Sequence, residues 1–342
     1  MKRLRVATPL RATDFEGVVF PRCLASAVSL LSVLFSAVLP VVAVAGIGAV
    51  LGRYRGVDVR PLSDVTLYVL APALVFYSLV TTPISGATAA RLFLGVAAFT
   101  VALVVIAEAA GRALGETSPV LGGFVLSSTF ANAGNYGIPL SAFAFGALGR
   151  STAVLYIAAQ SILMYTVGVY VAARGESVSA TDALRRVFGL PLIYAVAAAG
   201  VVRAFDLAPP TDTALMQTIK LTGDAAIPVM LLLLGIQLAD ATSGGTVRRV
   251  LPASGLKLLV APVVAIGIAL ALGLEGTVGR VFVLECAMPA AVTPLMLTIE
   301  FGGGEGGLSA ADFVSTTILV STLASLVTLT GLIALLQAEV VL

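Results

Sequence analysis

The chain has 342 residues, of which 59% are hydrophobic and only 11% are charged, with a formal net charge of +2. Soluble domains carry roughly 25% charged residues, so this composition excludes a water-soluble enzyme. The chain has no histidine, which excludes histidine-based metal sites and general bases. Cys23 lies near the N-terminus and Cys286 in an apolar segment, so neither a disulfide framework nor a thiolate metal cluster is expected. The mild charge argues against a nucleic-acid partner, and we predict no cofactor.

Apolar runs long enough to cross a bilayer, about 20 residues each, recur along the chain. They lack the alternation of membrane β-strands and predict an all-α, multi-pass protein of the cell membrane, surrounded by lipid. We expect ten membrane helices, at about residues 31–51, 62–80, 90–111, 119–147, 152–173, 188–205, 214–239, 250–273, 278–300 and 312–337.

The segment 1–27 precedes the first apolar run and contains two prolines and two acidic residues. We expect either a disordered tail or a start codon assigned too early; a signal peptide is the alternative, although the acidic residues interrupt its usual order. After it we expect a five-helix repeat over 28–173, a cytoplasmic loop over 174–187 and a second five-helix repeat over 188–342.

The basic residues of the short loops predict the orientation, because cytoplasmic loops are enriched in Lys and Arg. The loops that follow the odd-numbered segments hold nine of them, against about five on the other side. The nine are Arg53, Arg55, Arg60, Arg112, Arg174, Arg185, Arg186, Arg248 and Arg249. This places both termini outside the cytoplasm, although the basic residues of 1–27 favour the reverse.

Prolines repeat at nearly equal spacing in the two halves of the chain. Pro72 and Pro228 are 156 residues apart, and Pro139 and Pro294 are 155 apart. Because each half holds five predicted helices, the second half would enter the membrane with opposite polarity. Inverted repeats of this kind are typical of secondary transporters.

The predicted segment 119–147 contains residues that do not suit a continuous helix. Asn132, Gly134, Asn135, Gly137 and Pro139 fall within eight positions. Glycine and proline both disfavour a helix interior, and lipid cannot satisfy the freed backbone groups. We therefore predict a break that faces protein or a water-filled cavity.

The predicted segment 278–300 has a similar pattern, with Met288, Pro289, Thr293 and Pro294. Half-helix N-termini at such breaks attract anions, so these residues and those of 119–147 form a candidate substrate site. The alternative is that glycine and asparagine only mediate close helix packing.

Ionisable residues at membrane depth are costly and suggest function. Asp224 and Glu285 each lie one helical turn before a proline and are candidates for proton or sodium coupling. Lys257 would neutralise one of them or the substrate, or else extend to the interface. An interfacial position is expected for Glu108, and a helix–helix hydrogen bond for Gln160.

These motifs resemble the auxin efflux carrier family, and the likeness extends over about 31–337. It is carried by Asn132-Ala-Gly134-Asn135-Tyr-Gly137-Ile-Pro139-Leu140, Ala287-Met288-Pro289-Ala290-Ala291-Val292, Gly52-Arg53-Tyr54-Arg55-Gly56 and Ala225-Ala226-Ile227-Pro228 through Leu238. The resemblance implies ten helices in two inverted repeats, related in fold to bile-acid symporters and sodium–proton antiporters. It also implies that the broken fourth and ninth helices cross and that a moving domain carries the substrate past a scaffold.

The resemblance implies a small organic anion such as auxin, malate or malonate as substrate, and the short 174–187 loop is similar to prokaryotic members. Thr293 stands where many members carry Asn, which leaves substrate identity open. A homodimer is a candidate assembly. The alternative function is a sodium- or proton-coupled symporter or antiporter of the same fold, with an inorganic cation or a bile-acid-like substrate. The sequence has no nucleophile–base pair, which an intramembrane enzyme would need. It also has no phosphate-binding loop, which an ATP-driven pump would need.

Overall fold

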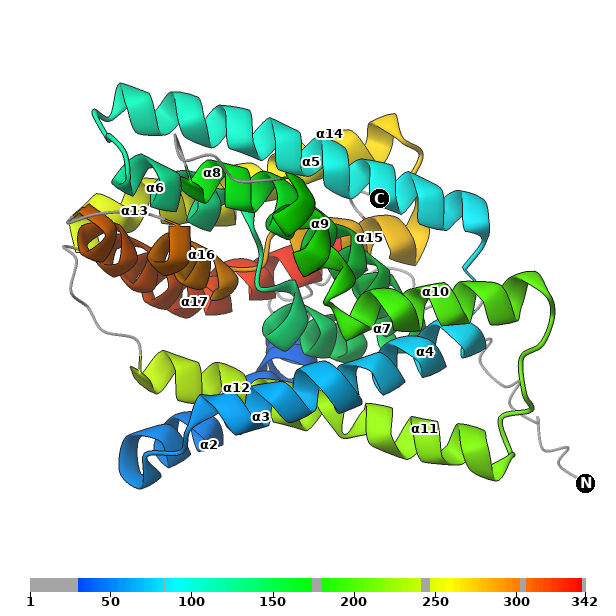
Figure 1. Ribbon diagram of the computed structural model, residues 1–342. Coiled ribbons are helices and arrows are strands. Elements are labelled where there is room, and N and C mark those ends of the chain that lie inside the picture. The colour runs from blue at the N-terminus through cyan, green and yellow to red at the C-terminus, as the bar shows by residue number, and fades with distance from the viewer. Residues whose placement is uncertain (1–29, 83, 174–179, 241–246, 302–305, 340–342) are drawn as a thin grey trace, which may run out of the picture.

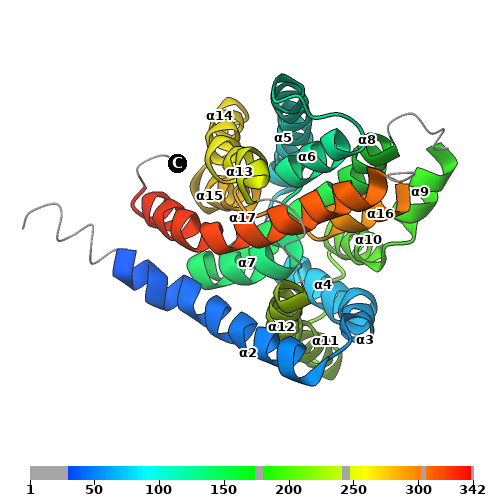
Figure 2. The same cartoon turned by 90° about the vertical axis from the view of Figure 1, so that its left-hand side faces the viewer.

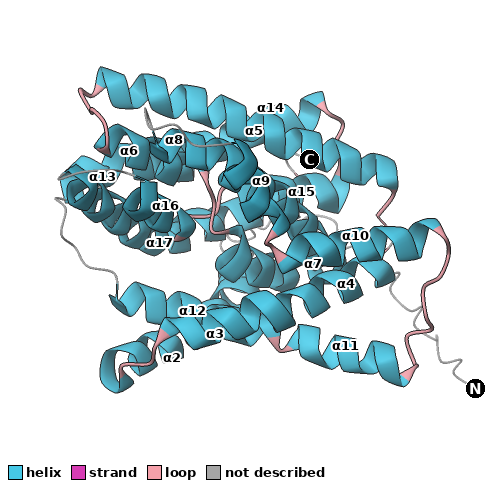
Figure 3. Ribbon diagram, in the orientation of Figure 1, coloured by secondary structure: helices cyan, strands magenta, loops and turns pink. Residues whose placement is uncertain are grey.

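The computed structural model describes residues 30–82, 84–173, 180–240, 247–301 and 306–339. Over these residues the chain is helical, apart from loops and one isolated antiparallel bridge between Ala131 and Ala290 (Figure 3). The residues 1–29, which include all of the predicted tail 1–27, lie outside the described part.

Seven described helices are long and apolar enough to cross a membrane, which makes this a multi-pass membrane protein. They are Leu30–Arg55, Val59–Thr81, Gly86–Ala113, Ala133–Ala173, Ala214–Ala239, Val247–Ala271 and Ala310–Gln337, and two shorter apolar helices are Val120–Thr129 and Pro191–Ala204. The predicted segment 278–300 is divided into two short helices, so the count of ten stays a prediction.

The first half of the chain runs from η1 to α9. Its elements are η1 (Leu34–Val38), α2 (Leu39–Arg55), α3 (Val59–Val65), η2 (Thr66–Leu70), α4 (Ala71–Thr81), α5 (Gly86–Ala113), α6 (Val120–Thr129), η3 (Ala133–Gly137), α7 (Ile138–Leu163), η4 (Met164–Gly168), α8 (Val169–Ala173) and α9 (Ala180–Phe188).

The second half runs from α10 to α17. Its elements are α10 (Pro191–Ala204), α11 (Ala214–Asp224), α12 (Ala226–Asp240), α13 (Val247–Gly255), η5 (Leu256–Val260), α14 (Ala261–Ala271), α15 (Gly276–Cys286), α16 (Thr293–Phe301) and α17 (Gly306–Gln337).

Two boundaries differ from the sequence-based expectation. The predicted separation at 148–151 is not a loop: α7 continues through it and changes direction earlier, at Gly146 (φ 66°, ψ −149°). Glycine adopts this backbone conformation without a steric penalty. The predicted loop 174–187 contains the short helix α9, which begins at Ala180.

The helices form two packed groups, which we call the lower and upper layers after their positions in Figure 1. In the lower layer, α2 packs on α12, and α4 packs on α10 and α11. In the upper layer, α6 packs on α5 and α17, α13 packs on α17, and α15 packs on α7 and α14. Figure 2 shows the same separation from the side, with α7 between the two layers.

Glycines set the close approach of α2 and α12 in the lower layer. A Cβ atom built on Gly48 would overlap the carbonyl oxygen of Leu232, and one built on Gly235 would overlap that of Ala45. Membrane helices associate through such small residues because lipid supplies no hydrophobic driving force between them. The lower layer is therefore held by backbone-to-backbone packing at its core.

Candidate functional site

Two interrupted helices meet near the centre of the molecule. The chain is extended between α6 and η3 and again between α15 and α16. The backbone N–H of Asn132 donates to the carbonyl of Pro289 (2.8 Å), and the backbone N–H of Ala291 donates to the carbonyl of Phe130 (3.1 Å). The two breaks thus pair as a minimal antiparallel ladder, which we call the crossing (residues 130–132 and 289–291).

The crossing does not include Pro139 or Pro294, the two prolines whose spacing suggested the repeat. Pro139 is the second residue of α7 and Pro294 the second residue of α16. At Pro294 the helix is just starting, and a helix start tolerates proline because its missing N–H would have no intrahelical partner there. Pro139 instead lies within the continuous helical segment that begins at Ala133 with η3. The prolines therefore follow the breaks, and the extended residues before them make the contact.

Side chains complete the hydrogen bonding on both sides of the crossing. The side-chain amide of Gln160 makes two hydrogen bonds to the backbone of Ala131: it donates to the carbonyl (2.9 Å) and accepts from the N–H (3.2 Å). The hydroxyl of Ser321 accepts from the N–H of Ala290 (3.2 Å). Because unpaired backbone groups are costly in a membrane interior, these two side chains make an extended backbone tolerable there. The predicted hydrogen bond of Gln160 is therefore made to backbone at the crossing.

Two ionisable side chains are fully buried beside the crossing. Glu285, with 0% exposure, accepts a hydrogen bond from Ser141 through Oε1 (2.6 Å), while its Oε2 has no partner among the described residues. A Cβ atom on Gly137 would overlap this carboxyl group, so the two residues are in tight contact. Lys257, also 0% exposed, does not extend to the interface. Its ammonium donates to the carbonyls of Thr129 (3.1 Å) and Cys286 (3.0 Å).

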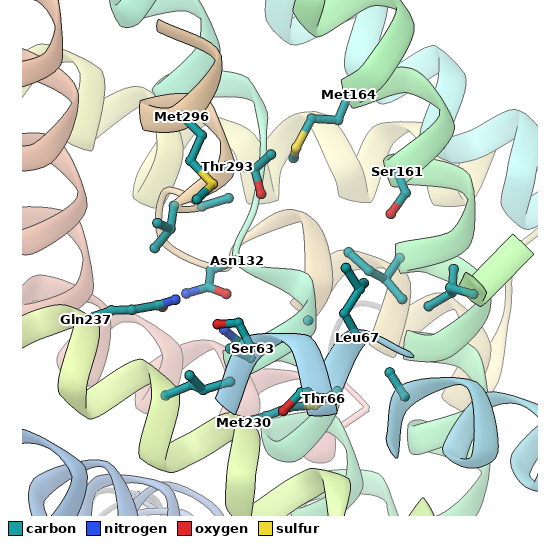
Figure 4. Close-up of a pocket in the computed structure, with 18 of the residues that line it drawn as sticks. Ser63, Thr66, Leu67, Asn132, Ser161, Met164, Met230, Gln237, Thr293 and Met296 are labelled. Atoms are coloured by element: carbon teal, nitrogen blue, oxygen red, sulfur yellow. The ribbon is translucent and has the colours of Figure 1, made fainter. Parts of the chain in front are cut away.

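A cavity of about 750 Å³ lies between the two layers next to the crossing. Four residues of the predicted site line it: Asn132, Gly134, Asn135 and Thr293. Figure 4 shows Thr293, Met296, Met164 and Ser161 on one side of this space and Ser63, Thr66 and Met230 on the other. Both helices that begin after the breaks, η3 with α7 and α16, present their first residues to the cavity. The first N–H groups of a helix have no intrahelical acceptors, so this wall can donate hydrogen bonds.

Two amide side chains in the cavity wall have unsatisfied groups. The Nδ2 of Asn132 and the Oε1 of Gln237 are buried and have no partner among the described residues. Figure 4 shows the two side chains pointing toward one another, Asn132 from the crossing and Gln237 from α12. A buried donor or acceptor left unpaired costs about 1–3 kcal/mol. A ligand that pairs with both would recover that free energy.

The remaining predicted site residues lie outside the cavity lining. Gly137, Pro139, Met288, Pro289 and Pro294 are buried behind it.

Two other predicted positions lie away from the cavity. Asp224 does not face the crossing; it pairs with Arg150 (3.1 Å) and with Lys220. Glu108 pairs with Arg112 near the end of α5 (2.7 Å).

Sequence reasoning missed Gln237 and Ser321, although the spacing of Thr317, Ser321 and Ser325 by four residues marks a polar stripe on α17.

Comparison with known proteins bears on the same residues. A protein-family model described as "Membrane transport protein" matches residues 33–185 and 178–333, and so includes both breaks. An uncharacterized transporter of Methanothermobacter thermautotrophicus is 30% identical over 283 residues, which cover 82% of this chain and 90% of the relative. The matches extend over both layers and the cavity between them, and the chain belongs to the membrane transport protein family, the auxin efflux carrier family.

Proposed function

We propose that this protein is a secondary active transporter that moves a small organic anion, a carboxylate, across the cell membrane. The observation that carries the proposal is the wall of the cavity beside the crossing. It combines two helix N-termini with the side-chain Nδ2 of Asn132, which has no hydrogen-bond partner within the described part of the chain. Helix N-termini favour negative charge, and an amide N–H is a donor for a carboxylate oxygen. The apolar lining elsewhere, such as Leu67, Met164 and Met230, suits the hydrocarbon part of such a solute.

The architecture that we propose is ten membrane segments in two inverted five-helix repeats. It is supported by the pairing of the two breaks, one in each half of the chain, and by the position of Pro72 and Pro228. Pro72 follows the π-helical turn η2, and Pro228 follows an interruption at Ala225, so both helices are irregular at the same place. In this scheme the upper layer moves as an elevator against the lower layer.

The structure corresponds, in our proposal, to an inward-facing state. The cavity extends from the crossing to the start of α3, where Arg60 and Asp64 line it. This end also carries the basic residues in the last turns of α2 and α5, which are Arg53, Arg55 and Arg112. Since cytoplasmic loops are enriched in such residues, we assign the cavity mouth to the cytoplasmic side and both termini to the opposite side.

Glu285 is our candidate for proton coupling, since it is a buried carboxyl group in contact with the first turn that follows the crossing. Asp224 belongs to an ion-pair cluster with Arg150 and Lys220 and is not part of the crossing. The alternative function is a sodium- or proton-coupled carrier of the same fold with an inorganic cation or a bile-acid-like substrate. The donor-rich wall at Asn132 favours the anion.

The test is uptake and counterflow in proteoliposomes across a panel of mono- and dicarboxylates, with and without a proton gradient. We expect at least one carboxylate to exchange, and Asn132→Leu and Asn135→Ala to abolish its exchange while the protein stays folded. Thr218→Val, on the exposed face of α11, is the matched control. If no small mono- or dicarboxylate moves under any gradient while a sodium or proton gradient drives an inorganic cation or a bile-acid-like solute, the alternative is correct.

A further inference from the structure

The ends of the half-helices that precede the breaks pose an electrostatic problem. α6 ends at Thr129 and α15 ends at Cys286, and both ends are buried at membrane depth. The last carbonyl groups of a helix lack intrahelical partners and carry partial negative charge. Two such ends brought together need a positive charge or hydrogen-bond donors between them.

The ε-ammonium of Lys257 lies between these two ends. It donates one hydrogen bond to the carbonyl of Thr129 (3.1 Å) and one to the carbonyl of Cys286 (3.0 Å), which are the final residues of α6 and α15. Its nitrogen also lies 5.5 Å from the centre of the Phe99 ring, on α5. One side chain thus joins three segments of the upper layer, α5, α6 and α15, from its own position on η5.

This arrangement has no contact with solvent. Lys257 is 0% exposed, and Cys286 and Phe99 are 0% and 1% exposed. A buried ammonium is retained only where hydrogen bonds and opposite charge offset its lost hydration. Here the hydrogen-bonding groups are backbone carbonyls, an aromatic face lies nearby, and the buried carboxyl group of Glu285 interacts with the ammonium electrostatically.

We propose that Lys257 is a positioning residue that supplies the cation of the crossing from within the chain. Its ammonium occupies the place between the two helix C-termini that a bound metal cation would otherwise take. The crossing therefore forms without sodium or potassium, and the proposed carrier does not need a metal cation to hold its broken helices in register. This deepens the proposed function, because it separates holding the site together from driving transport.

The first arm of the test uses the purified full-length chain in detergent. Its unfolding temperature is measured in sodium, potassium and choline chloride at equal concentration. We expect the same value in all three salts. A higher unfolding temperature in sodium than in choline would overturn the proposal, because it would show a metal cation bound to the folded state.

The second arm changes the side chain. Lys257→Met keeps most of the length and removes the charge, Lys257→Arg keeps the charge, and Lys257→Ala leaves room for a small cation. We expect a lower unfolding temperature in the Met and Ala variants and a smaller loss in the Arg variant. Methylammonium should restore much of the loss in Lys257→Ala but not in Lys257→Met, which has no space for it. A purely packing role would show no such rescue.

Arg53→Met is the matched control, since Arg53 is an exposed basic residue in the last turn of α2. It should change the unfolding temperature little and show no response to methylammonium. If neither neutral variant folds while Lys257→Arg does, the requirement for charge is supported. A Lys257→Met variant as stable as the parent, or a folded Lys257→Ala variant without rescue, would refute it. No readout uses a transported substrate, so failure of the carboxylate assay and failure of this inference are separate results.

Discussion

Arg150 on α7 and Asp224 on α11 form an ion pair, with 3.1 Å between nitrogen and oxygen, that joins α7 to the lower layer at the end opposite the cavity mouth. Hydrogen bonds from Ser151 to Thr82 (2.8 Å) and to the carbonyl of Ser78 (3.0 Å) make the same connection. Thr82 follows α4, whereas the cavity reaches the start of α3 at the other end of that helical segment. These contacts close one end of the molecule while the other stays open.

Arg150→Gln should loosen this closed end. Because a partly exposed ion pair contributes about 1 kcal/mol or less, we expect hydrogen exchange at Ser78–Thr82 to accelerate about two- to fivefold. Hydrogen exchange with mass spectrometry on the purified protein measures this directly. Lys220→Gln is the matched control: it removes a partner of Asp224 within α11 but leaves the Arg150 pair intact. Equal exchange in all three proteins would show that the pair does not hold the layers together.

Gly134 and Gly137 make a second comparison, because they lie three residues apart and have different surroundings. A Cβ atom at Gly134 meets no atom within 4 Å, whereas one at Gly137 would overlap the carboxyl group of Glu285. We expect Gly134→Ala to keep the unfolding temperature and to reduce carboxylate exchange, since its methyl group enters the cavity wall. Gly137→Ala should be destabilised by about 1–3 kcal/mol through overpacking. Thermal unfolding in detergent distinguishes them, and equal stability of the two variants would contradict this geometry.

The α2–α12 contact provides a prediction about the fold alone. Gly235→Ala places a methyl group on the Ala45 carbonyl, so the two helices must separate. We expect a loss of about 1–3 kcal/mol, measured as a lower unfolding temperature. Gly200→Ala on α10 is the control, because its Cβ atom meets nothing within 4 Å. If Gly235→Ala matches Gly200→Ala, the glycine contact does not set the packing of the lower layer.

Composition and apolar runs were enough to predict a helical, multi-pass membrane protein, since the bilayer sets the length and polarity of each span. The breaks were predictable because glycine, asparagine and proline cluster at Asn132–Pro139 and Met288–Pro294. Their partner residues were not. Gln160 lies 29 residues from Ala131 and Ser321 lies 31 residues from Ala290, and the register of the ladder depends on three-dimensional packing.

The ionisable residues show the same limit. Asp224 and Glu285 occupy the same sequence position relative to a proline, yet Glu285 is fully buried at the crossing and Asp224 is half-exposed in an ion pair. The difference arises because α15 packs on α7, which lies between the two layers, whereas α11 packs on α4 in the lower layer. Spacing alone does not distinguish these environments.

The last prediction concerns Gln160 and Ser321, the two side chains that hydrogen-bond to the backbone of the crossing. Gln160→Met keeps the volume but leaves the N–H and carbonyl of Ala131 unpaired, and Ser321→Ala leaves the N–H of Ala290 unpaired. An unsatisfied buried group costs about 1–3 kcal/mol, so Gln160→Met should be the more destabilised of the two. Thermal unfolding of both single variants and the double variant tests this. Because both side chains support one ladder, we expect the double variant to lose less than the sum of the single losses. Strict additivity would mean that the two breaks are held independently, and that the crossing does not form as one unit.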